Sequence, residues 1–110
     1  MITMLTQDYV YEEKREFVRK LEEALLCLDD IRGIEYRASR SNYIELVRID
    51  WHGAGDIHAY INVTANSLRQ ILNVVALTVK YGWPNWQVST KKEDKLWEEL
   101  GNEMDRKDND

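Results

Sequence analysis

Residues 34–63 read IEYRASRSNYIELVRIDWHGAGDIHAYINV, and apolar and polar side chains alternate through most of this stretch. A period of two is typical of β-strands that bury one face. Two turns interrupt the alternation, at Ser39–Asn42 and at His52–Asp56, where small and short polar residues gather. The pattern predicts three antiparallel strands, at residues 34–38, 43–51 and 57–63.

The second of these strands has apolar residues in both phases. Ile44 and Leu46 would face one side of the sheet, whereas Val47, Ile49 and Trp51 would face the other. If the strand buries only one face, both sets of apolar residues can be buried only when the register shifts by one residue between them. We therefore expect a β-bulge near Leu46 and Val47.

On the N-terminal side of the strands, apolar residues recur at steps of three and four from Phe17 to Ile31. This spacing predicts an amphipathic helix from about residue 8 to residue 32. Asp8 suits the N-terminal cap, because a short carboxylate accepts the free N–H groups of the first turn. Gly33 follows the last turn and suits a C-terminal cap.

A second helix is predicted after the strands. Ser67 and Gln70 have the capping-box pattern, and Tyr81-Gly82 ends the helical spacing. Most residues between them are aliphatic, so we expect this to be the most buried helix, with Leu72 in the core.

A third helix is predicted near the C-terminus. Thr90 and Glu93 form another capping box, and a narrow apolar stripe continues to Met104. The order of elements predicts a single α+β domain over residues 1–104, a helix–three-stranded antiparallel sheet–helix–short helix. We expect the first two helices to share one face of the sheet and residues 105–110 to form a polar tail.

Composition agrees with one cytoplasmic domain. The chain has 110 residues, 44% of them hydrophobic, and a single cysteine, Cys27. No run of about 18 apolar residues predicts a membrane span, and the first residues do not resemble an export signal. Cys27 lies among leucines of the predicted first helix, which favours a buried structural thiol over a nucleophile.

The sequence predicts a non-catalytic protein without a cofactor or a bound metal. Gly53-Ala54-Gly55-Asp56 lacks the Lys-Ser/Thr of a phosphate-binding loop and lies between strands. His52 and His58, near Asp50 and Asp56, have the side chains of a metal or proton-transfer site. Hairpin ends are commonly polar for solubility, however, and we favour that interpretation.

Aromatic residues suggest a binding surface. If Ile57 and Ala59 face the helices, His58 and Tyr60 face away, and Trp51 could join them on an open sheet face. Such a face could dock a protein or stack nucleic-acid bases. Alternatively, the third helix crosses this face and buries Trp51 and Tyr60 against Trp97 as a second small core.

Charge argues against a nucleic-acid partner. The net charge is −5, and residues 1–33 and 91–110 each contain eight acidic and five basic residues. Proteins that read nucleic acids usually carry clustered Lys and Arg instead. Double-stranded RNA-binding domains share the order helix, three strands, helix, but they carry several lysines where this sequence has Asn66-Ser67-Leu68-Arg69-Gln70.

Between residues 64 and 104, three short motifs resemble small prophage-encoded anti-CRISPR proteins that inhibit Cas9: Asn66-Ser67, Lys80-Tyr81-Gly82-Trp83 and Asn102-Glu103-Met104. The resemblance implies a small acidic protein of a phage or mobile element. It would occupy the site where Cas9 reads DNA, with carboxylates in place of phosphates. The matching carboxylates would be Asp50, Asp56, Glu93, Asp94 and Glu98.

The sequence thus predicts a binding protein that docks on a host protein and modulates or inhibits it. The alternative is a single-stranded nucleic-acid binder that uses the aromatic sheet face. The expected partner-binding residues are Trp51, Asp56, His58, Tyr60, Glu93, Asp94 and Glu98.

Overall fold

The computed structural model describes residues 2–28, 30–39, 41–53, 57–81 and 91–109, with the backbone alone at 2–10, 91 and 104–109. It confirms the predicted α+β fold. The elements follow the order α1 (Ile2–Leu25), β1 (Ile31–Ser39), β2 (Ile44–Trp51), β3 (Ile57–Asn62), α2 (Leu68–Tyr81) and α3 (Lys91–Asn109).

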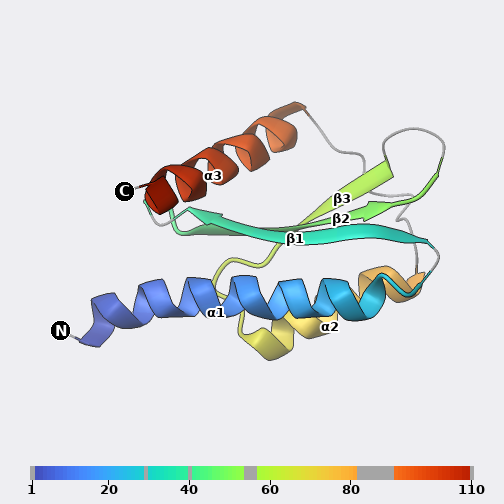
Figure 1. The fold of residues 1–110 in the computed structure, drawn as a ribbon, viewed down its shortest axis with the longest axis horizontal. Helices are drawn as coiled ribbons and strands as arrows, with labels where there is room; N and C mark the ends of the chain where they lie inside the picture. Colours follow the sequence, from blue (N-terminus) through green and yellow to red (C-terminus); the bar gives the residue numbers. More distant parts are fainter. Residues whose placement is uncertain (1, 29, 40, 54–56, 82–90, 110) are drawn as a thin grey trace.

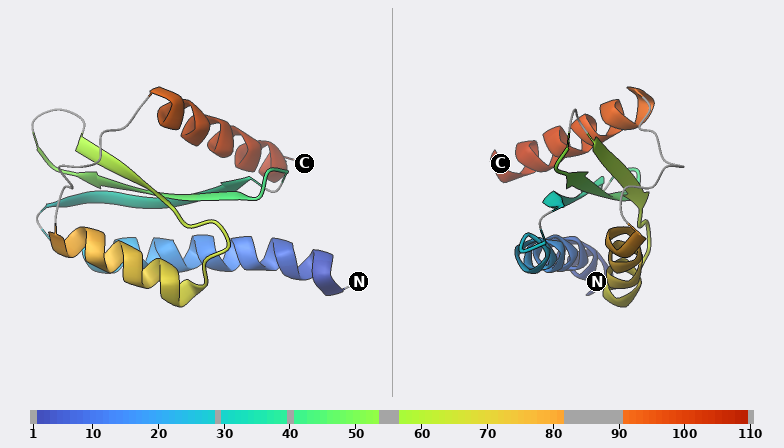
Figure 2. Two further views of the ribbon diagram at one scale, coloured as in Figure 1. Left: turned by 180° about the vertical axis from the view of Figure 1, so that it is seen from behind. Right: turned by 90° about the vertical axis from the view of Figure 1, so that its right-hand side faces the viewer.

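The molecule has three layers. The sheet has the order β1-β2-β3 with both pairs antiparallel. Helices α1 and α2 lie side by side on one face of the sheet, and α3 lies across the other face (Figure 1, Figure 2). The predicted placement of the first two helices is therefore confirmed.

The main core lies between the sheet and the helices α1 and α2. Strand residues at every second position fill it, because alternate side chains of a strand point to one face. Helix α1 adds Val18 and α2 adds Ile71 and Val75, all of them fully buried. The strands contribute Ile31, Ile34, Tyr36, Ala38, Val47, Ile49, Trp51 and Ala59.

The expected bulge in β2 is wrong. Pairing of β2 with β1 is regular from Ile44 to Asp50, and pairing with β3 is regular from Leu46 to Trp51. Both faces of β2 are buried, because α1 and α2 cover one face and α3 covers the other. Val47 belongs to the main core and Leu46 to a smaller core beneath α3, so two phases of apolar residues need no register shift.

The first helix ends earlier than predicted. Helix α1 stops at Leu25, and Ile31 and Gly33 belong to β1 instead of the helix and its cap. The β1–β2 register shifts between Ile31 and Gly33, so β1 holds one extra residue there. This bulge turns Ile31 and Ile34 toward the same core although they are three residues apart. Because Ile31 is buried as part of the sheet, the chain forms a strand there and not a further turn of α1.

Helix α2 begins as predicted but is not the most buried helix. The Ser67 hydroxyl oxygen accepts the Gln70 N–H at 3.2 Å, and the Gln70 side-chain oxygen accepts the Ser67 N–H at 2.8 Å. Leu72, however, is 40% exposed, and Leu77 and Tyr81 are 52% and 75% exposed. A three-stranded sheet is narrow, and α1 occupies part of the same face, so only one side of α2 reaches the core.

Helix α3 continues to Asn109 and therefore includes most of the segment that the sequence indicates as a polar tail. Its predicted capping residue Thr90 and the side chain of Met104 lie outside the described residues. Within the ranges that the structure describes, no helix is both long enough and apolar enough to cross a membrane.

A buried ion pair joins α1 to β2. The Lys14 ammonium donates to Glu45 Oε1 at 2.8 Å, and both side chains are more than nine-tenths buried. The Tyr36 hydroxyl donates to Glu45 Oε1 at 2.7 Å, and the Ala65 N–H donates to Glu45 Oε2 at 2.8 Å. Ala65 has a positive φ of 62°. Glu45 thus ties α1, β1 and the connection before α2 to one point, and its lone pairs are satisfied.

Candidate functional site

Helix α3 covers part of the sheet face that the sequence left open. Tyr60 of β3 and Trp97 of α3 pack with ring centroids 5.7 Å apart, and Leu46 and Leu100 complete a second small core. Tyr60 is only 6% exposed. The second-core alternative is therefore confirmed for Tyr60.

Trp51 is not on this face. It pairs with Ile57 across β2 and β3, whereas Tyr60 pairs with Arg48. Directly paired residues point to the same side of a sheet, so Trp51 and Tyr60 point to opposite sides. Trp51 is 4% exposed in the main core. The expectation that Trp51 and Tyr60 share one surface is wrong.

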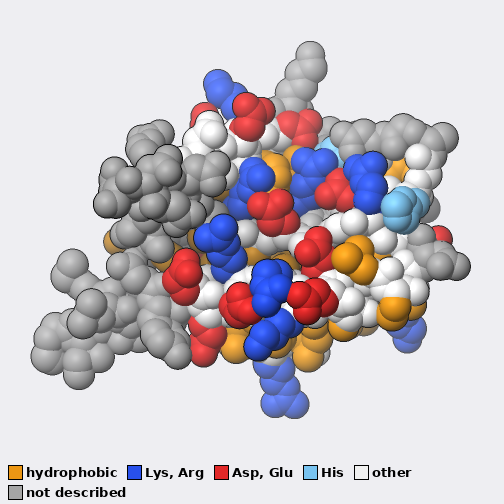
Figure 3. Space-filling model, viewed as in Figure 1, with side chains coloured by type: hydrophobic (Ala, Val, Ile, Leu, Met, Phe, Trp, Pro, Cys, Tyr) orange, Lys and Arg blue, Asp and Glu red, His pale blue; other side chains and the backbone are white. Residues whose placement is uncertain are grey.

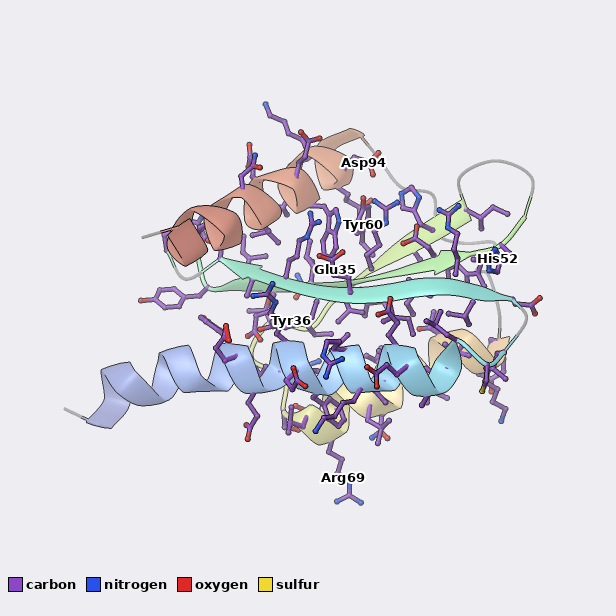
Figure 4. All side chains as sticks on the ribbon, viewed as in Figure 1. Glu35, Tyr36, His52, Tyr60, Arg69 and Asp94 are labelled. Carbon is purple, nitrogen blue, oxygen red and sulfur yellow. The ribbon has the colours of Figure 1, made fainter. Side chains whose placement is uncertain are left out.

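A polar cluster borders the second core (Figure 4). The Tyr60 hydroxyl donates to Asp94 Oδ1 at 2.6 Å, and Arg48 Nη1 donates to the Tyr60 hydroxyl oxygen at 3.1 Å. His58 Nε2 lies 3.3 Å from the same Asp94 oxygen. Three of the predicted binding residues, His58, Tyr60 and Asp94, therefore meet, and they hold the first turns of α3 on β3.

The arginines of this face have partners within the chain. Arg48 donates from Nε and Nη2 to Asp50 at 2.9–3.2 Å, and Arg32 Nη2 lies 3.5 Å from Asp50 Oδ1. The guanidinium of Arg37 stacks 4.3 Å from the Trp97 ring centroid and donates to the Trp97 carbonyl at 2.8 Å. A Cβ at Gly101 would lie 2.6 Å from Arg37 Nη1, so the glycine leaves room for this contact.

The protonation states of the cluster suit a structural contact. Burial, assisted by the hydrogen bond to Asp94, raises the pKa of Tyr60 far above its ordinary value. The hydrogen bond from Tyr60 is the main cause that lowers the pKa of Asp94, with a smaller contribution from His58. Near neutral pH the phenol therefore stays a donor and the carboxylate stays ionised. Neither group is tuned for proton transfer at that pH.

We expect Tyr60→Phe to lower the free energy of unfolding by about 1 kcal/mol at pH 7, because it removes a hydrogen bond to a half-exposed carboxylate. The ionised Asp94 carboxylate contributes its full share of the folding free energy above its ordinary pKa of 3.8. That contribution is lost as pH falls through the lowered pKa of Asp94 in the folded state. The stability difference between wild type and variant should therefore narrow below about pH 4.

Denaturant unfolding from pH 7 to pH 2.5 measures this difference. Tyr43→Phe is the matched control, because the Tyr43 side chain is 58% exposed. A Tyr60→Phe deficit that stays constant down to pH 2.5 would contradict the role given to Asp94.

A second surface lies between α1 and α2, on the opposite side of the molecule from α3. Its middle and C-terminal part is an open apolar pocket of about 210 Å³ lined by Leu21, Leu25, Leu72, Val75, Ala76, Val79 and Lys80. Leu26 and Leu28, which follow the end of α1, are exposed. Leu77 and Tyr81 of α2 are also exposed, but they lie about 140° and 180° around the helix from Leu72 and do not line this pocket. Hydrophobic atoms gather along the lower edge of Figure 3, where α2 lies, below the charged side chains of α1.

The N-terminal part of the same surface carries charged side chains of both signs. A pocket of about 490 Å³ is lined by Glu12, Glu13, Glu16, Phe17, Lys20 and Leu68. On both helices its residues precede those of the apolar pocket along the chain. We call the two pockets together the α1–α2 groove. It is charged at one end, where Arg15 and Arg19 pair with Glu12 and Glu16, and apolar along the rest.

The remaining predicted residues are dispersed. Asp56 lies outside the described residues, Glu93 is half-buried in the first turn of α3, and Glu98 is exposed on that helix. Cys27 is exposed after α1 and its thiol donates to the Ala24 carbonyl at 2.9 Å, so the prediction of a buried thiol is wrong. His52 is exposed at the end of the sheet (Figure 4). Among the described side chains, no three His, Cys, Asp or Glu residues gather as metal ligands.

Sequence reasoning missed the α1–α2 groove, although a signal was present. Helix α2 carries aliphatic residues on more than one side, at Leu72 and Leu77 as well as at Ile71 and Val75. A helix of this kind is either buried on all sides or apolar at the surface. The width of the sheet decides whether such a helix is buried on all sides or is apolar at the surface.

No family model matches this sequence, and neither the curated proteins nor the solved structures contain a match.

Proposed function

We propose that this protein is a non-catalytic binding protein that docks on a host protein through the α1–α2 groove and modulates or inhibits that partner. The observation that carries the proposal is the open apolar pocket between α1 and α2, in which Leu72 is 40% exposed. Contiguous exposed apolar side chains beside a polar surface are typical of protein-interaction sites. Tyr and Leu on a helix also lose little backbone entropy when a partner covers them.

The α3 side of the molecule supports this proposal less well. Tyr60 and Trp97 are buried, so neither presents the exposed ring that base stacking requires. Asp50 is engaged by Arg48 and Asp94 by Tyr60, which leaves these carboxylates poorly placed to imitate phosphates. If the resemblance to Cas9 inhibitors has a functional basis, we propose protein contact through α2 as its route.

Site-specific photocrosslinking in the cells that encode the chain tests the proposal. A photoreactive amino acid replaces Leu72 in the lining of the groove or, as the control, Glu98 on α3; both side chains are exposed on helices. We expect the Leu72 position to yield one defined product that contains a second, identifiable protein. The Glu98 position should not yield it.

Two results would contradict the proposal. One is the same set of products from both positions, which would indicate random encounters. The other is a Leu72 product that contains only two copies of this chain, which would make the groove a self-association surface.

A further inference from the structure

We infer that α3 is a cover over the second face of the sheet and that it opens as a unit, while the sheet, α1 and α2 stay folded. Opening would expose Leu46 of β2 and Tyr60 of β3, which α3 buries. This conformational step does not depend on the α1–α2 groove. Three features point to it: the separation of the two cores, the exposed position of the polar contacts of α3, and the pairing of charges on the sheet.

The two cores are separate, and α3 belongs to only one of them. Thirteen described residues are buried in the main core, and they come from α1, α2 and residues 31–63. The second core has four described buried residues, of which α3 contributes Trp97 and Leu100. Because the sheet lies between α3 and the other two helices, loss of α3 removes none of the thirteen (Figure 1). A region with few buried apolar contacts opens at a lower free energy than the whole molecule.

The polar contacts that hold α3 lie near solvent. The Asp94 carboxylate, which accepts the Tyr60 hydroxyl, is half-exposed. The Arg37 side chain, which donates to the Trp97 carbonyl and stacks on its ring, is 23% exposed. Charged contacts that water can reach contribute little to stability. Helix α3 is therefore held mainly by the four residues of the second core.

Opening of α3 would leave the two arginines beneath it paired. Arg37 also donates from Nε to Glu35 at 2.8 Å, and Arg48 donates from Nη2 to Asp50 at 2.9 Å. In each pair the carboxylate belongs to the same strand as the arginine, so both pairs remain when α3 leaves. Separation of α1 from the sheet would instead break the buried pair with Glu45, which is costly.

Away from the sheet, α3 is a weak helix. Its described apolar side chains form a narrow stripe, Leu96, Trp97 and Leu100, and Gly101 follows them directly. Glycine lowers helix stability, and most helices in proteins depend on tertiary packing for their stability. Opening should therefore unfold α3 and expose the backbone N–H groups of its central turns to solvent. Hydrogen exchange of these groups measures the opening.

Native-state hydrogen exchange of the full chain, followed by NMR at low denaturant concentrations, tests the inference. We expect the α3 amides near Trp97 and Leu100 to share one opening reaction and to exchange at least about tenfold faster than core amides such as those of Ile49 and Val75. The α3 opening should also depend less on denaturant, because it exposes less surface than global unfolding.

Variants in the two cores should give asymmetric results where the core amides follow global unfolding. Ile71→Val, a small truncation in the main core, should accelerate exchange of the core amides about fivefold and of the α3 amides less than twofold, because Ile71 stays buried when α3 opens. Ile71→Ala repeats the comparison with a larger effect. Leu100→Ala should accelerate both sets at least about tenfold, because global unfolding also undocks α3. Circular dichroism verifies the fold of each variant.

Two results would overturn the inference. One is equal protection of the α3 and core amides, with equal acceleration of both by Ile71→Val, which would show that the chain unfolds in a single step. The other is exchange of the α3 amides at unrelated rates without dependence on denaturant, which would show fraying of single turns instead of a common opening. Neither result bears on docking through the α1–α2 groove, because α3 lies on the other face of the sheet (Figure 2).

Discussion

Lys14→Ala should lower the free energy of unfolding by about 3 to 5 kcal/mol at neutral pH. The substitution leaves the carboxylate of Glu45 buried without its cation, and Glu45 is only 3% exposed. Removal of one partner of a buried ion pair is costly, because the remaining charge keeps its desolvation penalty and loses the attraction that offset it. The hydrogen bonds from Tyr36 and Ala65 to Glu45 remain but do not neutralise it.

Denaturant unfolding followed by circular dichroism measures the effect. Lys20→Ala is the matched control on α1, since Lys20 is exposed, and it should change stability by less than about 0.5 kcal/mol. Lys14→Met retains most of the side-chain volume and separates lost charge from lost packing. We expect it to be nearly as destabilising as Lys14→Ala, and a near-neutral Lys14→Met variant would refute the role of the buried pair.

The sequence contained a signal for this pair. Lys14 falls in the apolar stripe of α1, between Tyr11 and Val18, both of which are buried. A cation at such a position needs a buried acceptor. Glu45 shares its phase in β2 with Val47 and Ile49, so it had to face the same core. Both signals can be read from periodicity, but the pairing of two distant elements cannot.

The strands and their order were predictable because alternation is a local property. Ile34, Tyr36 and Ala38 all face the main core as their period requires. The bulge at the start of β1 was not predictable, since Ile31 also fits the spacing of α1. Tertiary burial decided between the two, and no local pattern carries that information.

The candidate site was predictable only in part. The structure does bring together His58, Tyr60 and Asp94. Their hydrogen bonds, with one from Arg48 to Tyr60, attach α3 to β3 and leave no open binding site there. The wrong placement of Trp51 beside Tyr60 could have been avoided by following the strand pairing. Tyr60 pairs with Arg48, and Trp51 is three residues after Arg48 in β2, so Trp51 and Tyr60 point to opposite faces of the sheet. The α1–α2 groove depends on the width of the sheet and on the position of α1, which are three-dimensional properties.

Ile71→Ala should lower the free energy of unfolding by about 2 to 5 kcal/mol, whereas its neighbour Leu72→Ala should lower it by only about 1 kcal/mol. Ile71 is fully buried, so its truncation leaves a cavity in the main core. Leu72 is 40% exposed and lines an open groove, so solvent already reaches part of its side chain. The higher helix propensity of alanine favours both variants slightly and does not change their order.

The proposed docking through the α1–α2 groove depends on α2 having one face in the core and another at the surface. The difference in unfolding free energy between Ile71→Ala and Leu72→Ala tests this division most directly, because the two sites are adjacent on one helix. We predict that Ile71→Ala is the less stable variant by at least about 1 kcal/mol. Equal destabilisation of 2 kcal/mol or more by both substitutions would show that Leu72 is also core, and the α1–α2 groove would then not be an open surface.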